Sequence, residues 1–416
     1  MKGSKVAHSK QSNKAVQKPG STEVDPKIAE AKKAFEQKKQ TFIVRAIWTF
    51  VMIGLFVGVI LSGHVYIALL IALLQVLSYN EVINLTGEKQ YFDDLPWGRI
   101  LSWYFMVVAM FYQKGESLFM FFRNVGIFER VLYRLIAYHR LISYALYMGG
   151  LMFFVCTLQP GYYRQQFAQF TTTHMAIFFV IIQGNYIELN ILHGLYWFLI
   201  PVSLVIVNDI MAYVCGITIG RTPLIKISPK KTVEGFLGAW LFTMIAAILL
   251  TYLSASSDYM VCPMDRVGVS AFSEHTCVRD AVFVARDYNF FNLHTFHFAP
   301  IYIHSVVLAT FASLVAPFGG FFASGTKRAF KAKDFGDTIP GHGGITDRFD
   351  CQFVMGFFSC IYYDTFIKTP GYPSFRVVWD AVTMLSYEDQ QKLAHDILAA
   401  AGNHGSNHLH DVSLAM

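Results

Sequence analysis

Charged side chains are scarce in this sequence. Only 15% of its 416 residues are Asp, Glu, Lys or Arg, whereas soluble globular proteins contain about a quarter. Hydrophobic residues make up 54% of the chain, and 38 Phe and 22 Tyr are among them. This balance excludes an ordinary soluble protein and predicts a polytopic membrane protein.

Long uncharged apolar runs recur along the chain at the length of about 20 residues that a bilayer-crossing helix needs. Because hydrocarbon satisfies no backbone polar group, each run must be helical. The predicted fold is therefore all-α, a polytopic integral membrane protein with about nine transmembrane helices. The runs lie near 43–62, 65–82, 98–112, 141–157, 174–190, 192–216, 235–253, 304–322 and 352–367.

The sequence also lacks a recognisable signal segment, internal repeats and closely spaced cysteine pairs, which narrows the class of membrane protein further. No apolar segment follows Met1, so we expect no cleavable secretory signal. No internal repeat is visible. The six cysteines include no close Cys-x-x-Cys pair, which argues against a structural zinc site. Cys262 and Cys277 both lie in the hydrophilic connection 254–303. They could form a disulfide if that connection faces an oxidising lumen, or remain free thiols.

The positive charge is concentrated in the N-terminal tail. Residues 1–45 carry eleven Lys and Arg against four acidic residues, a net +7 compared with +6 for the whole chain. We expect a basic, largely disordered cytosolic tail over 1–41, a transmembrane domain over 42–367, and a polar C-terminal tail over 368–416. A helix is predicted after Asp25-Pro26, either attracted to anionic lipid or solvated. An amphipathic helix from Ser386 to Ala401 is predicted in the C-terminal tail.

The distribution of charged loops predicts the orientation. If the basic N-terminus is cytosolic, the chain returns to the cytosol after the second, sixth and eighth runs. The basic loop 217–234 and the segment 324–350 then share the cytosolic face, while 254–303, with three Arg against five acidic residues, lies on the other face. The loop 113–140 does not fit this orientation. It carries Lys114 and four arginines, yet the count of crossings places it on the lumenal side.

One polar segment stands between two apolar runs and reads S-G-T-K-R-A-F-K-A-K-D-F-G-D-T-I-P-G-H-G-G-I-T-D-R-F-D from Ser324 to Asp350. Its basic side chains suit phosphate oxygens, and its carboxylates are hard ligands of the kind that Mg²⁺ takes together with substrate phosphates. The basic residues are Lys327, Arg328, Lys331, Lys333 and Arg348, and the principal acidic ones are Asp334, Asp347 and Asp350.

Spacing suggests how these carboxylates are arranged. Asp347 and Asp350 are three residues apart, so on a helix they share one face and could hold one cation. Asp334 would join them through a chain reversal at the intervening glycines, which also let backbone N–H groups approach a phosphate. His342 could donate to a phosphate or act on a proton, and the sequence does not decide between these.

A second polar segment, N-D-I-M-A-Y-V-C-G-I-T-I-G-R-T-P-L-I-K-I-S-P-K-K-T-V-E-G, runs from Asn208 to Gly235. Asp209 lies at an apolar run, where a carboxylate is costly and by default functional; pairing with a lysine for helix packing is the alternative. Ser228 to Thr232 could begin a helix at the membrane surface, with Lys230 and Lys231 clamping a phosphate or merely anchoring a helix at the headgroups.

The two segments together resemble a known enzyme family. The run S-x-x-K-R-x-x-x-x-K-D-x-x-x-x-x-P-G-H-G-G-x-x-D-R-x-D is similar to the signature of phosphatidate cytidylyltransferases, also called CDP-diacylglycerol synthases, and G-R-T-P-L-I-K-I-S-P-K-K-T-x-E-G resembles their second landmark. The resemblance extends from about Phe42 to Phe366, and D-L-P-W followed by S-W-Y-F near 95–105 favours the eukaryotic form.

The resemblance implies a reaction and a location. Phosphatidic acid and CTP give CDP-diacylglycerol and pyrophosphate, with Mg²⁺, in the endoplasmic reticulum membrane with the site facing the cytosol. Our hypothesis assigns each residue one role or two. Catalytic groups are Asp334, Asp347, Asp350, Lys333 and His342. Substrate-binding groups are Arg221, Ser228, Lys230, Lys231, Thr232, Ser324, Lys327, Arg328 and Arg348. Metal ligands are Asp209, Asp334, Asp347 and Asp350.

Two other functions fit similar side chains. A CTP-using lipid kinase would need the same cations and carboxylates but would release CDP. A transporter of an anionic substrate would also place charge within the membrane, although such transporters often show two related halves. The expected partners are CTP, phosphatidic acid and membrane lipids, with no nucleic acid. The sequence leaves homo-oligomer formation undecided.

Overall fold

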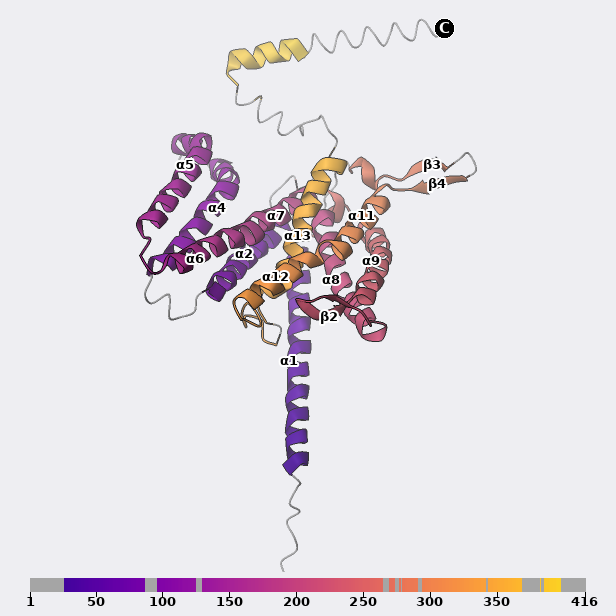
Figure 1. Cartoon of the computed structure of the whole chain (residues 1–416). Coiled ribbons are helices and arrows are strands. Elements are labelled where there is room, and N and C mark those ends of the chain that lie inside the picture. The colour runs from indigo at the N-terminus through magenta and orange to yellow at the C-terminus, as the bar shows by residue number, and fades with distance from the viewer. Residues whose placement is uncertain are drawn as a thin grey trace, which may run out of the picture.

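The structure is a computed structural model that describes residues 26–86, 96–124, 129–264, 269–273, 277, 279–290, 294–341, 343–368, 382 and 385–397. Helices dominate these residues (Figure 1). The helices of the first half are α1 (Pro26–Ser62), α2 (His64–Thr86), α4 (Pro96–Asn124), α5 (Glu129–Cys156), α6 (Tyr163–Ala176), the π-helix η1 (Ile177–Ile182) and α7 (Gln183–His193). Those of the second half are α8 (Leu195–Thr218), α9 (Val233–Ser254), α10 (Asp258–Val261), η2 (Ala281–Phe283), α11 (Ile301–Leu314), α12 (Pro317–Ala329), α13 (Thr346–Tyr362) and η3 (Tyr363–Ile367).

The predicted apolar runs are mostly helical, with breaks at Gly194 in the run 192–216 and at Val315 and Ala316 in the run 304–322. Among the described residues, seven helical stretches are long and apolar enough to cross a membrane. The runs 98–112 in α4 and 352–367 in α13 and η3 fall outside those seven. The all-α polytopic fold is confirmed, while the exact number of crossings stays a prediction. Most of the discordant 113–140 loop is helical, since α4 ends at Asn124 and α5 begins at Glu129.

Two short antiparallel hairpins add to the helical fold. Strand β1 (Pro223–Ile225) pairs with β2 (Ser228–Thr232), and β3 (Arg286–Phe290) pairs with β4 (His294–Phe298). The stretch Ser228 to Thr232, which could have begun a helix, instead forms β2, and α9 begins at Val233 with Thr232 as its N-cap. Pro229 and the ladder with β1 keep this segment extended.

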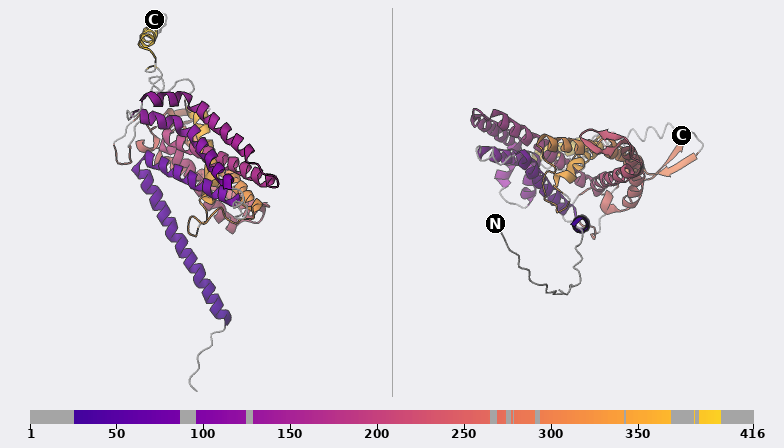
Figure 2. Two further views of the ribbon diagram at one scale, coloured as in Figure 1. Left: turned by 90° about the vertical axis from the view of Figure 1, so that its left-hand side faces the viewer. Right: turned by 60° about the horizontal axis from the view of Figure 1, so that its bottom comes forward.

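The hairpins lie at opposite ends of the helical body. Strand β2 and the loop between α12 and α13 lie at the end from which the N-terminal part of α1 projects, whereas β3 and β4 lie at the other end (Figures 1 and 2). The two basic segments therefore share one face, as the sequence predicted, and the connection 254–303 belongs to the opposite face.

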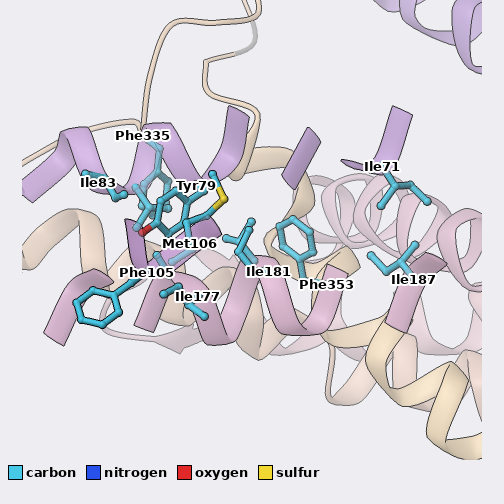
Figure 3. Packing of buried hydrophobic residues seen from close by; sticks show 14 of the residues in the cluster. Ile71, Tyr79, Ile83, Phe105, Met106, Ile177, Ile181, Ile187, Phe335 and Phe353 are labelled. Carbon is cyan, nitrogen blue, oxygen red and sulfur yellow. The ribbon is translucent and has the colours of Figure 1, made fainter. Parts of the chain in front are cut away.

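The buried side chains form two hydrophobic clusters. One cluster joins α2, α4, η1 and α7, and it also includes Phe335 and Phe353 (Figure 3). The other joins α8, α9, α11 and α13 around Tyr196 and Trp197. Phe335 comes from the polar segment after α12, so the loop that carries the signature is tied to the core through its aromatic ring.

A polar cluster crosses the first of these cores. Lys114 Nζ in α4 lies 2.5 Å from Glu188 Oε1 in α7 and 3.1 Å from Gln75 Oε1 in α2. Gln75 Nε2 in turn donates to the carbonyl oxygen of Ile181 in η1, at 3.3 Å. Because unpaired polar groups are costly inside a membrane, this cluster fixes α2, α4 and α7 relative to the π-helix.

The helices predicted in the two tails are present where the tails are described. Helix α1 begins at Pro26 and continues without a break into the first apolar run. In the C-terminal tail, residues 387–397 are helical, and the backbone N–H of Asp389 donates to Ser386 Oγ at 3.2 Å, which identifies Ser386 as the N-cap. Residues 398–401 of the predicted helix lie outside the described residues.

Cys262 and Cys277 form a disulfide, with Cα atoms 5.8 Å apart. The bond closes a loop over a sequence separation of 15 residues, for which the loop-entropy model gives about 3 kcal/mol. We expect Cys262→Ser to lower the free energy of unfolding by about that amount. A thermal melt in detergent tests this. Cys156→Ser is the matched control, since Cys156 is a free, exposed cysteine, and an equal loss in both variants would contradict the expectation.

Candidate active site

The polar segment between α12 and α13 is organised around Asp347. Its Oδ1 forms an ion pair with Lys327 Nζ from α12, and both side chains are largely buried. Its Oδ2 accepts from the backbone N–H of Phe335 at 3.0 Å and of Gly344 at 3.3 Å. A Cβ at Gly344 would lie 2.9 Å from Gly336 N, so only glycine allows this chain reversal. Asp347 therefore holds the loop closed.

Glu81 of α2 holds the same loop from the other side. Its carboxylate accepts from the backbone N–H of Ile345 at 2.9 Å and of Thr346 at 2.8 Å, and from the hydroxyl of Thr338. The first turn of a helix has unpaired N–H groups that favour an anion. Glu81 is 6% exposed, so it caps α13 from inside the protein.

A polar cleft lies on the outer side of this loop. It encloses about 530 Å³, and Arg45 of α1 closes one edge by donating from Nε to the carbonyl oxygen of Gly341 at 2.8 Å. Three cations face two carboxylates in the lining, a balance that suits a polyanion such as a triphosphate. The lining residues are Arg45, Lys333, Asp334, Asp337, Gly341, Gly343 and Arg348.

The second polar segment is shaped by α9. Thr232 is the N-cap of α9, its Oγ1 accepting from Gly235 N at 3.2 Å. The Glu234 carboxylate accepts from the backbone N–H of Arg221 at 3.0 Å and from the Thr222 hydroxyl at 2.8 Å. A Cβ at Gly235 would lie 2.8 Å from the Ala212 carbonyl oxygen, so glycine permits the close contact of α8 and α9. These bonds hold β2 against the end of α8.

The two polar segments approach each other at the start of α12. Lys231 Nζ of β2 lies 3.9 Å from Asp209 Oδ1 of α8, and both residues line a small cavity with Pro317 and Phe321 of α12. On the same helix, a Cβ at Gly320 would lie 3.5 Å from Asp350 Oδ2 of α13. Residues more than a hundred positions apart therefore lie against the same helix.

Asp209 and Asp350 are the carboxylates that best fit a divalent cation. The Asp350 carboxylate accepts from Cys351 N at 2.7 Å and is also hydrogen-bonded to the Cys351 side chain. Next to Asp209, the Oδ1 atom of buried Asn208 has no hydrogen-bond partner among the described residues. Two carboxylates with a nearby amide oxygen are hard donors, and Mg²⁺ is commonly held by one or two carboxylates together with substrate phosphates.

The four predicted metal ligands do not form one cluster. Within the described ranges, no group of three or more His, Cys, Asp or Glu side chains is placed to hold a metal ion. Asp347 is bound to Lys327 and to the loop backbone, and Asp334 lies in the cleft with Lys333. The three-residue spacing of Asp347 and Asp350 places both on α13. The carboxylate of Asp347, however, is already bonded to the loop backbone and to Lys327.

The other predicted site residues divide between the two segments. Ser324, Lys327 and Arg328 lie on the last turns of α12, and Ser228 and Lys231 lie on β2. Arg221 is in the turn held by Glu234, where its backbone rather than its side chain makes the described bond. Lys230 is in β2 with an undescribed side chain, and His342 lies outside the described residues.

Glu81, Arg45 and Glu234 were missed by the sequence reasoning. Glu81 lies at the end of the second apolar run, so the rule that identified Asp209 as a lone carboxylate in an apolar context could have found it. Glu234 lies within the second landmark but was not singled out. Arg45 carries no such signal, because a basic residue at the start of a span is usually a headgroup anchor.

Comparisons with known proteins agree with the geometry. Residues 43–366 match the model of the cytidylyltransferase family. The chain is 46% identical to the phosphatidate cytidylyltransferase of Saccharomyces cerevisiae over 84% of this chain and 79% of the relative. It is 38% identical to phosphatidate cytidylyltransferase 1 of Arabidopsis thaliana over 94% and 93%, and 41% identical to phosphatidate cytidylyltransferase 1 of Homo sapiens over 85% and 78%.

Proposed function

The chain belongs to the cytidylyltransferase family, and from that premise we propose how its site carries out the reaction. The enzyme is a nucleotidyltransferase that makes CDP-diacylglycerol from CTP and phosphatidic acid. The observation that carries the mechanism is that Asp209, with Lys231 at 3.9 Å, and Asp350 both lie against the first turns of α12.

The residues of the site bring together two anions. A phosphate oxygen of phosphatidic acid attacks the α-phosphorus of CTP, a new P–O bond forms, and the bond to the leaving pyrophosphate breaks. The attacking phosphate is already ionised near pH 7, so no strong general base is needed. Catalysis then depends on in-line positioning and on neutralising charge.

We assign the triphosphate to the cleft and the lipid phosphate to the Asp350 side of the site. Lys333 and Arg348 line the cleft, and Lys231 reaches the site from β2. Lys327 is held by Asp347, so its charge stays fixed beside Asp350. The loop backbone around Gly343, whose φ is +84°, can turn N–H groups toward phosphate oxygens.

We further propose that Mg²⁺ is held by Asp209 and Asp350. When bound, the ion would neutralise the phosphates of both substrates and polarise the phosphorus that is attacked. Without the ion, the two carboxylates repel each other and would repel an approaching triphosphate. Both acidic groups thus become favourable to substrate only together with a cation.

The location follows from the charge pattern of the loops. The site lies at the face from which the basic N-terminal helix projects, and basic segments favour the cytosolic side, where CTP is found. The disulfide of Cys262 and Cys277 belongs to the opposite face and suits an oxidising lumen. We propose the endoplasmic reticulum membrane, with the site facing the cytosol.

Label tracing with purified protein tests the proposed function. Incubation with phosphatidic acid, Mg²⁺ and CTP labelled in the α-phosphate should place the label in lipid, while label in the γ-phosphate should appear in pyrophosphate. Transfer of the γ-label to lipid would identify a kinase instead. Chelation by EDTA should stop the reaction and added Mg²⁺ should restore it, so full activity in EDTA would exclude the role given to the metal.

A further inference from the structure

An apolar pocket lies beside the candidate site, within the helical body. Side chains of α2, α6, η1, α12 and α13 line it. Three lining residues are polar, namely Thr326, Thr346 and Asp350, and the rest of the lining is apolar. Phe335 and Phe353 form part of its wall and belong to the hydrophobic core shown in Figure 3.

The polar end of this pocket belongs to the site already described. Asp350 is the carboxylate on which Asp209 and Lys327 act, and Thr326 immediately precedes Lys327 on α12. A ligand in the pocket would therefore have one end among phosphate-binding charges and its remainder among hydrocarbon side chains. That polarity matches a lipid with a phosphate head.

Two aromatic rings mark the side of the pocket that faces lipid. Phe179 of η1 and Phe322 of α12 stack with ring centroids 4.4 Å apart and planes 20° apart. Phe322 is 41% exposed, and α12 belongs to a membrane-spanning stretch, so the exposed part of the ring meets acyl chains of the bilayer. The stacked pair separates the pocket from the surrounding lipid.

The wall that carries Phe179 is built by a specific polar contact. The π-helix has a wider turn than an α-helix and occurs often at functional sites. Gln75 Nε2 donates to Ile181 O in η1, and a Cβ at Gly184 would lie 2.3 Å from that nitrogen. Gln75 is itself held by Lys114, so buried bonds maintain the π-helical shape of this wall.

We propose that an acyl chain of the lipid substrate begins at this pocket, whose volume of about 40 Å³ holds only the first carbons, and that Phe179 and Phe322 determine which chains are accepted. The inference rests on the proposed function, because phosphatidic acid supplies the chain. The phosphate lies at Asp350, the first carbons follow the wall formed by Phe335 and Phe353, and the rest of the chain runs along the stacked pair toward the bilayer. Chains too short to reach the rings do not sense them.

Substrates of two chain lengths test this assignment. We expect Phe179→Ala and Phe322→Ala each to lower the ratio of kcat/KM for dioleoyl to dihexanoyl phosphatidic acid roughly threefold, because the longer chain loses its dispersion contacts with the ring. KM for CTP should not change. Phe178→Ala and Phe318→Ala are matched controls, since these neighbours are 49% and 58% exposed and do not line the pocket.

Several results would overturn the inference. An unchanged ratio in both pocket variants would exclude the rings from chain selection, and an equal loss with both substrates, or an equal shift in the controls, would indicate a structural effect. A wild-type protein that makes no CDP-lipid from either substrate would instead overturn the proposed function. Phosphatidic acid with a diazirine in its acyl chain needs no variant: its label should map to η1 and α12, and labelling confined to other helices would contradict the pocket.

Discussion

Asp350→Asn is expected to lower kcat/KM for CDP-diacylglycerol formation by roughly 10²–10³-fold, the usual cost of removing one charge-stabilising group from an active site. The substitution keeps the volume of the side chain and can keep the hydrogen bond from Cys351 N. It removes the charge that, with Asp209, would hold the cation. The thermal stability of the protein should stay close to that of wild type. Turnover with and without Mg²⁺, together with a thermal melt in detergent, measures both quantities.

The control for this prediction lies in the segment that follows α13. Asp364 is in η3, where it forms an exposed ion pair with Lys368 at 3.6 Å, and such surface pairs contribute little to stability. Asp364→Asn should leave turnover unchanged. Asp347→Asn should behave differently from both, because it breaks the buried pair with Lys327 and should reduce stability as well as activity. Normal turnover in Asp350→Asn would remove that residue from the site.

Glu81→Ala is expected to have the second large effect, by releasing the signature loop. The substitution leaves the N–H groups of Ile345 and Thr346 buried without an acceptor, at about 1–3 kcal/mol for each. Since Thr338 loses its partner too, the loop should lose its fixed position over the site. We expect a lower melting temperature and a fall in kcat, measured on the same purified sample.

Glu81→Gln separates the two contributions. The amide keeps one oxygen for the backbone N–H groups, so this variant should be more stable than Glu81→Ala. Its activity should lie between those of wild type and Glu81→Ala, because the loop is held by fewer bonds. If Glu81→Ala were as active and as stable as wild type, the capping of α13 by Glu81 would have no part in forming the site.

The sequence predicted the parts of the fold that depend on hydrophobicity and charge. Apolar runs gave the helices, since hydrocarbon forces internal hydrogen bonding. The rule that an isolated carboxylate in such a run is functional singled out Asp209, whose role as a metal ligand stays a prediction. The parity of crossings placed the loop 217–234 and the segment 324–350 on one face, and β2 and the loop between α12 and α13 do lie at the same end of the helical body (Figures 1 and 2).

The detailed arrangement of the candidate site depends on contacts between distant residues, which the spacing of residues along the sequence does not determine. Asp347 and Asp350 share a helix face, but the chain reversal at Gly344 brings backbone N–H groups to Asp347 alone, which leaves Asp350 for a ligand. Glu81 contacts Thr346 across 265 residues. A contact of that kind has no local pattern, because it is set by how α2 packs against the start of α13. The π-helix η1 likewise depends on Gln75 from a distant helix.

Anomalous scattering from Mn²⁺, in crystals of the protein grown with CTP, tests most directly whether the two polar segments form one site. We expect a peak between the carboxylates of Asp209 and Asp350, with the triphosphate within reach of Lys231 from one segment and Arg348 from the other. A manganese ion bound at Asp334 and Asp337 alone, or a triphosphate contacted by only one of the two segments, would contradict a shared site.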